Sequence, residues 1–229
     1  MSYLIVVAHP DDEVLGAGGT MHILAQQGKE VNVCITSGMA TARAQRPSDG
    51  ELTDDTHNSM EILGVNKRII GDYPNIELNT VPHIKLVQFI EKAIIETSPD
   101  IIITHHPSDL NNDHLHTSLA CQAATRLFQR RPELKPIKEL WYMEVPSSTD
   151  WAMNKAFGQF NPNTYVEIGE DGMNKKLEAL AMYRNVMREF PHPRSVEALK
   201  GLAAYRGGQS ACRYAEAFEC AFRRIEVKG

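Results

Sequence analysis

The sequence predicts an α/β fold of three layers, in which an open, mainly parallel, Rossmann-like sheet in the strand order 3-2-1-4-5 is followed by an irregular C-terminal extension. Two observations predict it. Short apolar runs alternate with longer segments of helical periodicity from the first residues onward. The segments between successive runs are long enough to form the right-handed helical crossovers that parallel strands require.

Five runs predict the strands of the sheet. The first, 3–8 (YLIVVA), is apolar throughout, which is typical of a parallel strand buried on both faces. The second, 30–36 (EVNVCIT), alternates apolar and polar residues with the period of a strand. The remaining runs are 67–71, 100–105 and 138–144.

Apolar residues at helical spacing predict the helices between these strands. Glycines close two of them, and Pro82 stands in the first turn of another, where proline is tolerated. The ranges are 14–28, 54–64, 81–98 and 114–131. The extension is expected to hold a loop at 145–162, a strand at 164–168, helices near 171–189 and 195–206, and a final strand around 216–225.

Composition limits the classes of protein. The 229 residues, 42% hydrophobic and 23% charged, are expected to form a single domain over 1–229. A net charge of -5 argues against a nucleic-acid partner, because polyanion binding needs a basic face. Membrane insertion is not expected, because no run reaches the roughly 18 apolar residues that a spanning helix needs.

A cytoplasmic location is expected from two further features. The N-terminus begins with a strand-like run and lacks the pattern of a secretion signal. The cysteines are scattered without the paired spacing of a thiolate zinc site, which favours reduced thiols. They are Cys34, Cys121, Cys212 and Cys220.

The two densest His/Asp motifs should meet in space. The motif HPDDE (9–13) follows the first predicted strand, and HHPSDLNNDHLH (105–116) follows the fourth. In the order 3-2-1-4-5 these strands are neighbours, and the crevice outside their carboxyl ends is the switch point at which ligands bind.

Imidazole and carboxylate groups in such a crevice predict a catalytic divalent metal ion, usually zinc with three protein ligands. His9 and Asp12, three residues apart in a turn, can face one ion, whereas Asp11 points elsewhere and could take a proton from metal-bound water. His114 and His116 diverge on a helix, so one of them is expected to be a ligand and the other not. Asp113 is placed to cap the helix or to orient a histidine.

Other readings of these motifs predict different functions. The glycines of GAGG (16–19) follow a first strand, as a dinucleotide-binding turn would, but they lack the GxGxxG spacing and follow an acidic loop. They are expected instead to let the first helix pack close to the sheet. A non-catalytic sugar- or nucleotide-binding module, with a structural metal or none, is the alternative from another class.

The stretches AHPDDEVLGAGG (8–19) and NDH (112–114) resemble the PIG-L/LmbE family of zinc-dependent N-acetylglucosamine deacetylases. Three later stretches also resemble sugar-deacetylase members, so the similarity extends over nearly the whole chain and implies an LmbE-like fold. They are EVPSSTDW (144–151), PHPRS (191–195) and YAEAFE (214–219).

The resemblance implies that His9, Asp12 and His114 bind zinc, although Mn, Fe, Co or Ni could occupy the same ligands. Asp11 is then the general base for a zinc-bound water that attacks the amide carbonyl of an N-acetylated amino sugar or its conjugate, releasing acetate. Asp113 matches the acid that orients a histidine in relatives. The second motif departs from the family at Asn111, where many relatives have a histidine proposed as an acid or oxyanion stabiliser.

The proton donor to the leaving amine is therefore open. Asp109, His105, His106 and His116 are the candidates to replace the missing histidine, and we place Asp113 and His116 with Asp11 among the catalytic residues. Return of the proton by Asp11 itself is the economical choice.

The substrate is predicted to be a small N-acetyl sugar, and formation of a homo-oligomer is left open. Predicted contacts with the substrate come from several segments that follow strands or carry the resemblance. They are Arg43 with Arg46 behind it, Asp109, Trp151, His192 and Arg194. Zinc-dependent hydrolysis of a non-sugar amide is the enzymatic alternative, and the identity of the sugar is not predicted.

Overall fold

The structure is a computed structural model that describes residues 1–42, 47–153 and 158–226. Its strands form one sheet in the order β3-β2-β1-β4-β5-β7-β6. The strands are β1 (Ser2–Val7), β2 (Glu30–Ile35), β3 (Lys67–Ile70), β4 (Ile101–His105), β5 (Glu139–Met143), β6 (Thr164–Glu167) and β7 (Ala215–Arg223). The strands β1 to β5 pair in parallel, and β7 pairs antiparallel with both β5 and β6.

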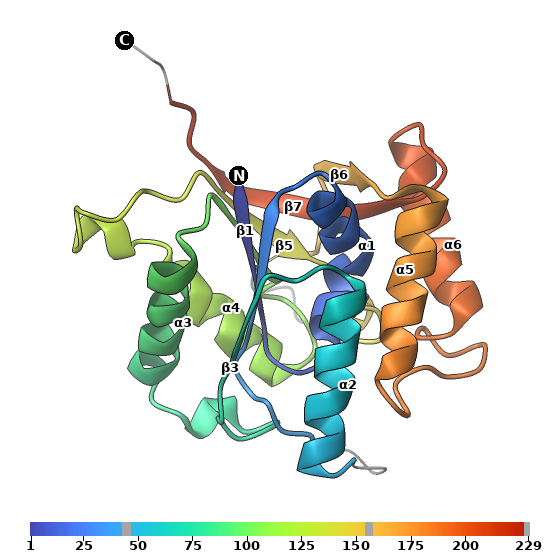
Figure 1. The fold of residues 1–229 in the computed structure, drawn as a ribbon, viewed down its shortest axis with the longest axis horizontal. Coiled ribbons are helices and arrows are strands. Elements are labelled where there is room, and N and C mark those ends of the chain that lie inside the picture. The colour runs from blue at the N-terminus through green and yellow to red at the C-terminus, as the bar shows by residue number, and fades with distance from the viewer. Residues whose placement is uncertain (43–46, 154–157, 227–229) are drawn as a thin grey trace.

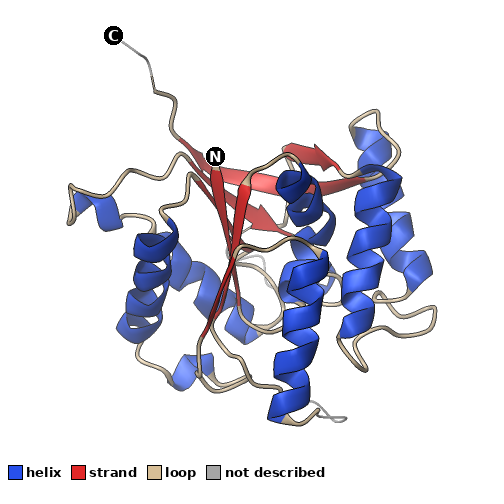
Figure 2. Ribbon diagram, viewed as in Figure 1, coloured by secondary structure: helices blue, strands red, loops and turns tan. Residues whose placement is uncertain are grey.

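Helices cover both faces of the sheet (Figures 1 and 2). The helices are α1 (Asp12–Gln26), α2 (Asp49–Ile62), α3 (His83–Thr97), α4 (Asn112–Ala124), α5 (Gly169–Met182) and α6 (Val196–Gln209), with 3-10 turns η1 (Leu78–Thr80), η2 (Leu127–Gln129) and η3 (Thr149–Trp151). On one face α5 packs against α1 and α2, and on the other α3 packs against α4. Each face has its own apolar core, to which β1 contributes alternate residues: Ile5 and Val7 to one, Leu4 and Val6 to the other.

The predicted strand order is confirmed, and β7 and β6 extend the sheet beyond β5. Three predicted helix boundaries are wrong. Helix α5 ends at Met182 rather than near residue 189, because the backbone turns extended at Tyr183, whose ψ is 101°. Helix α2 begins about a turn before the predicted residue because Ser48 forms a capping box, its Oγ accepting from Glu51 N (3.3 Å) while Glu51 Oε2 accepts from Ser48 N (2.8 Å). Helix α4 ends at Ala124 rather than continuing to residue 131, and η2 follows it.

The C-terminal extension is more regular than predicted and is joined to α1 by a buried ion pair. Helix α1 breaks at Ala17, whose φ is -144°. Glu216 of β7 accepts from Gly19 N (3.1 Å) and Thr20 N (2.7 Å) beyond the break. Lys176 of α5 donates to Leu15 O (2.8 Å) before the break and to Glu216 (2.6 Å). The polar groups freed by the break are thus satisfied inside the protein.

The GAGG glycines allow close packing around α1, as expected. A Cβ on Gly16 would lie 2.3 Å from Met143 Sδ of β5, and one on Gly19 would lie 2.7 Å from Ile168 Cδ1. Gly16 therefore packs α1 against the sheet, while Gly19 faces the start of α5. Among the helices of the described residues, none is long and apolar enough to cross a membrane.

We expect Gly16→Ala to lower the free energy of unfolding by about 1–3 kcal/mol, because the added methyl overpacks a buried contact with Met143. Urea denaturation measures this change. Gly201→Ala is the matched control: Gly201 lies in α6, and a Cβ added there would meet no atom within 4 Å, so the same substitution should stabilise by up to ~1 kcal/mol. Equal midpoints for the two variants would contradict the packing argument.

Candidate metal centre

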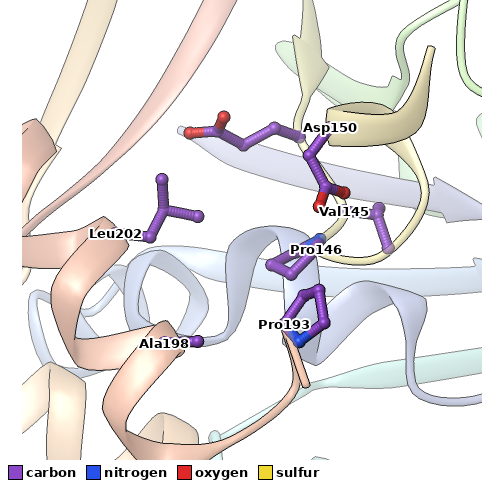
Figure 3. A pocket seen from close by; sticks show the side chains of 7 residues that line it. Val145, Pro146, Asp150, Pro193, Ala198 and Leu202 are labelled. Atoms are coloured by element: carbon purple, nitrogen blue, oxygen red, sulfur yellow. The ribbon is translucent and has the colours of Figure 1, made fainter. Parts of the chain in front are cut away.

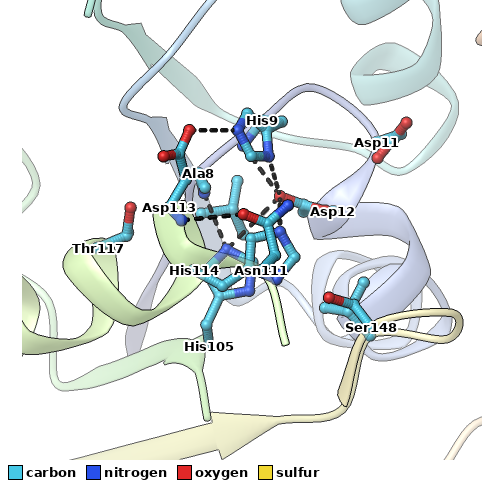
Figure 4. A network of polar contacts seen from close by, with 12 residues as sticks. Ala8, His9, Asp11, Asp12, His105, Asn111, Asp113, His114, Thr117 and Ser148 are labelled. Atoms are coloured by element: carbon cyan, nitrogen blue, oxygen red, sulfur yellow. Dashed lines mark hydrogen bonds and ion pairs between the residues drawn. The ribbon is translucent and has the colours of Figure 1, made fainter. Parts of the chain in front are cut away.

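The two His/Asp motifs meet at the carboxyl edge of the sheet (Figure 4). β1 and β4 pair in parallel, with Val6 opposite Thr104, so the segments that follow them leave the sheet side by side. The turn after β1 carries His9, and Asp12 begins α1. The loop after β4 leads to His114 in the first turn of α4.

His9, Asp12 and His114 form a compact cluster of buried ligand-type side chains. The Asp12 carboxylate lies between the two imidazoles, with Oδ2 at 3.3 Å from His9 Nδ1 and 3.2 Å from His114 Nε2. One donor atom from each of the three residues lies within 4.8 Å of the others. The arrangement can hold one divalent ion between two nitrogens and an oxygen.

A second carboxylate stands behind each of these imidazoles. Asp113 Oδ2 lies 2.9 Å from His9 Nε2 and accepts from Ile76 N at 2.6 Å. Asp109 Oδ2 lies 3.1 Å from His114 Nδ1 and accepts from the Thr149 hydroxyl at 2.7 Å. These contacts favour a proton on the outer nitrogen of each ring, so that the inner nitrogen is the one available to bind a metal ion once it has lost its own proton.

Charge in the cluster is strongly coupled. Burial lowers the pKa of His114, but Asp12 and Asp109 outweigh it and raise the pKa to about 10. Burial raises the pKa of Asp109, but the neighbouring His114 brings it down to about 2. The same imidazole holds the pKa of Asp12 well below its usual range in spite of burial. Without a metal ion, the buried carboxylates therefore keep His114 charged.

His105 supports His114 from the side. Its ring stacks on that of His114 at a centroid distance of 3.8 Å and an angle of 14°, and its Nε2 accepts from Ala8 N at 2.9 Å. Burial, and then the charge of His114, lower the pKa of His105 to about 3. His105, Asp109 and His114 form a second group of side chains that lie close enough together to bind a metal ion. In that group, however, Asp109 already accepts hydrogen bonds from the Ser148 and Thr149 hydroxyls.

Asp11 adopts a backbone conformation that L-residues rarely take, with φ at 100°. Its N–H donates to Glu13 Oε2 at 3.1 Å. The other oxygen of Glu13 accepts from the Tyr183 hydroxyl at 2.5 Å, and both Glu13 and Tyr183 are buried. Tyr183 and Glu13 thus hold the strained turn that carries Asp11, as such conformations require.

A cavity of about 250 Å³ opens onto the cluster. Among the described residues its walls come from the turn after β1, from the segments beyond β2, β3, β4 and β5, and from the segment between α5 and α6. They are His9, Asp11, Asp12, Ala42, Asn75, Ile76, Asn111, His114, Ser147, Ser148 and Arg194. Arg194 Nη1 lies 3.6 Å from Asp11 Oδ2, and its Nε donates to Ser147 Oγ at 2.8 Å. The cavity therefore faces a carboxylate, a guanidinium and the inner side of the cluster.

Asn111 contributes its amide to the same cavity. It is the N-cap of α4, and its Oδ1 accepts from Asp113 N at 2.9 Å. Since the oxygen is engaged by the helix, the NH₂ group is the part of the side chain left to face the cavity.

Several residues predicted to be catalytic or to contact the substrate are not among the described residues that line this cavity. Asp109 is 6% exposed, stands behind His114, and is not among the described residues that line the cavity. His116 is half-buried on α4. It follows His114 by two residues, and side chains at that spacing point in different directions on a helix, so His116 does not join the cluster. Trp151 and His192 are exposed and do not line the cavity. Arg43 and Arg46 lie outside the described residues.

The sequence reasoning missed Tyr183, Asn75 and Ile76. Asn75 and Ile76 follow β3, so the argument that strand ends share one edge could have found them. Tyr183 follows α5 and reaches Glu13 across 170 positions, and no local pattern marks that contact.

The family model described as GlcNAc-PI de-N-acetylase (PIG-L) matches residues 4–125. An uncharacterized deacetylase, YaiS, from Escherichia coli is 26% identical over 188 residues, which are 80% of this chain and 90% of the relative. The diacetylchitobiose deacetylase of Thermococcus kodakarensis is 27% identical over 225 residues, 93% of this chain and 80% of the relative.

A third relative has a different activity in its name. The 4-oxalmesaconate hydratase of Pseudomonas putida is 25% identical over 251 aligned positions, covering 98% of this chain and 90% of the relative. Among solved structures, the conserved protein TT1542 from Thermus thermophilus superposes with a TM-score of 0.79 at 24% identity, covering 99% of this chain and 98% of the other. That likeness shows the fold.

We expect metal binding to release about one proton per ion at pH 7, because a ligand imidazole must be neutral whereas His114 is charged in the metal-free protein. The part of the release that comes from His114 should fall as the pH rises through about 10, the pKa of His114. Calorimetric titration with zinc in two buffers of different ionisation enthalpy measures it. His57→Ala, which removes an exposed imidazole of α2, should leave it unchanged, and identical heats in both buffers would contradict the prediction.

We expect Tyr183→Phe to lower the free energy of unfolding by about 1–3 kcal/mol, because buried Glu13 loses a hydrogen-bond donor. Chemical denaturation measures the loss. The control is Tyr165→Phe, which removes a longer hydroxyl contact to Pro162 O at 3.4 Å and should cost less. A smaller effect at Tyr183 than at Tyr165 would show that Glu13 does not depend on this contact.

Proposed function

The chain belongs to the PIG-L family, and on that premise we propose that it is a metal-dependent hydrolase that removes the acetyl group from an N-acetylated amino sugar or its conjugate. The observation that carries the proposal is the meeting of His9, Asp12 and His114 beside a cavity that Asp11 also lines. Deacetylases among the relatives support the reaction type.

In this proposal His9, Asp12 and His114 hold the ion, and zinc is the first candidate because two imidazoles and a carboxylate suit it. A bound divalent ion would lower the pKa of a water molecule and polarise the amide carbonyl. Asp113 and Asp109 orient His9 and His114 through their outer nitrogens, at 2.9 and 3.1 Å. Both act as positioning residues.

Asp11 is the proposed general base. Its carboxylate is set apart from that of Asp12 and lines the cavity (Figure 4), so it can take the proton of the attacking water. Arg194 places a positive charge 3.6 Å from Asp11 Oδ2, within reach of a sugar hydroxyl or of the developing oxyanion.

Asp11 also returns the proton to the leaving amine. Of the described residues lining the cavity, Asn111 stands where many relatives have a histidine, and a carboxamide does not titrate in this range. Its NH₂ can donate a hydrogen bond but not a proton. His105 and Asp109 lie behind His114, and His116 is directed elsewhere. His106 is buried with its Nε2 3.6 Å from Glu219 Oε2 and is not among the described residues that line the cavity. Asp11 is then the group placed for both transfers.

Hydration of a carbon–carbon double bond is the second candidate function. It is favoured by the hydratase relative, whose identity is close to that of the deacetylases, and by Arg194, which could bind a substrate carboxylate. Hydrolysis of a non-sugar amide uses the same groups as the leading proposal and differs only in the substrate.

The test measures acetate release from a panel of N-acetyl amino sugars and their glycosides by the zinc-loaded protein, alongside loss of absorbance from unsaturated dicarboxylates. We expect Asp11→Asn to keep its metal and lose about 10²–10⁴-fold in kcat, because only the base is removed. His114→Ala should lose the metal itself.

Elemental analysis and the acetate assay together separate these roles. Acetate release by both variants at the wild-type rate would sink the assignment. Hydration without acetate release would instead establish the second candidate.

A further inference from the structure

The chain that leaves α5 is tied to α2 by an arginine. Arg184 donates through Nε to both oxygens of Asp55, at 3.1 and 2.9 Å, through Nη2 at 2.8 Å, and through its backbone N–H at 3.2 Å. Its Nη1 also contacts Glu51. Asp55 is 4% exposed, and the planar guanidinium meets its carboxylate in the geometry that makes such pairs strong and specific. The function proposed above gives this ion pair no role.

Arg184 fixes the neighbouring Tyr183. Helix α5 ends at Met182, so its hydrogen bonds hold Tyr183 from one side, through the Tyr183 N–H to Leu180 O at 3.1 Å. The contacts of Arg184 with α2 hold the chain on the other side. The buried ring between these two anchors is directed at Glu13 Oε1, to which the Tyr183 hydroxyl donates at 2.5 Å.

Glu13 in turn holds one of the two peptide planes that flank Asp11. The Asp11 N–H belongs to the plane before its Cα and donates to Glu13 Oε2 at 3.1 Å. The Asp11 carbonyl belongs to the plane after its Cα and accepts from Leu15 N at 2.9 Å, at the start of α1. Because φ and ψ describe how the two planes are turned relative to each other, the strained φ of 100° persists only while both are held. Release of the first plane would let the backbone relax toward negative φ and would move the carboxylate.

Arg194, at the far end of the same segment, has anchors of its own. Its Nε donates to Ser147 Oγ at 2.8 Å, and the next residue, Ser195, is buried and caps α6. Pro193 lines a separate cavity of about 190 Å³ beside α6 (Figure 3), whereas Arg194 lines the metal-site cavity. A change at Arg184 should therefore leave the Arg194 guanidinium in place.

We propose that Arg184 and Tyr183 are positioning residues for Asp11, through which the fixed position of α2 is passed to the proposed general base. The inference rests on the proposed deacetylation and assigns to it two residues that are not among the described residues lining its cavity. Because they act on the base and not on the candidate ligands or on Arg194, their loss lowers kcat and leaves zinc content and KM close to those of the wild type.

The experiment measures zinc content, kcat and KM for Tyr183→Phe and Arg184→Gln, with the N-acetyl amino sugar of the panel above that the zinc-loaded wild type turns over fastest. We expect kcat to fall about tenfold in each, because a displacement of ~1 Å can cost up to ~10²-fold, and KM to stay within about twofold. The matched control is Arg130→Gln. Arg130 pairs with Glu91, and these side chains are 60% and 12% exposed, against 43% and 5% for Arg184 and Asp55. The control should keep the wild-type kcat.

A double-mutant cycle with Asp11→Asn separates positioning from a general loosening of the fold. If Tyr183 and Arg184 act through Asp11, neither substitution should lower kcat further once Asp11 is already Asn. The same tenfold loss in both backgrounds would show a structural effect and overturn the inference, as would a wild-type kcat in either folded variant. Arg184→Gln, at a half-exposed side chain, keeps the test decisive if Tyr183→Phe fails to fold. Absence of acetate from every sugar of the panel overturns the proposed function as well.

Discussion

The site depends on one buried carboxylate oxygen. Asp12 Oδ2 accepts from His9 N at 2.9 Å and lies within 3.5 Å of ring nitrogens of His9, His105 and His114. Those rings come from segments about a hundred residues apart, so the cluster exists only because β1 and β4 are adjacent in the sheet. Asp12 is 2% exposed, and a carboxylate so buried persists as an ion only with positive charge close by. In the metal-free protein His114 supplies that charge, and a divalent ion could replace it.

The acidic residues around this centre fall into two groups with different roles. Asp109 and Asp113 do not face the cavity; each fixes one imidazole from behind, while backbone or hydroxyl donors hold the carboxylate in turn. Asp11 does face the cavity, and its strained turn is held by Glu13 and Tyr183. Glu13 is fully buried, and this burial raises its pKa to about 8. Rigid packing of this kind holds reacting groups at the distances and orientations that a reaction needs.

Strand order and the meeting of the two motifs could be predicted because both follow from local patterns and from the geometry of parallel sheets. The direction in which each side chain points could not be predicted in this way. Asp109 and Asn111 lie two residues apart in one loop, yet Asp109 turns inward to His114 while Asn111 lines the cavity. The direction of Asp109 is set by the Thr149 hydroxyl, a tertiary contact, whereas that of Asn111 is set by its local cap on α4. Ser48 is the opposite case: its capping box is a local pattern, and it would have placed the start of α2 correctly.

The two halves of the chain contribute different parts of the site. All three candidate ligands lie within residues 4–125, the range matched by the family model. Arg194, Ser147, Tyr183 and the Lys176–Glu216 pair lie beyond it. That later part contributes Ser147, Ser148 and Arg194 to the wall of the cavity and braces α1 at its break, but it supplies none of the three candidate ligands. Relatives named as deacetylases and as a hydratase therefore pose no contradiction: the metal-binding half can be shared while the residues that receive the substrate differ.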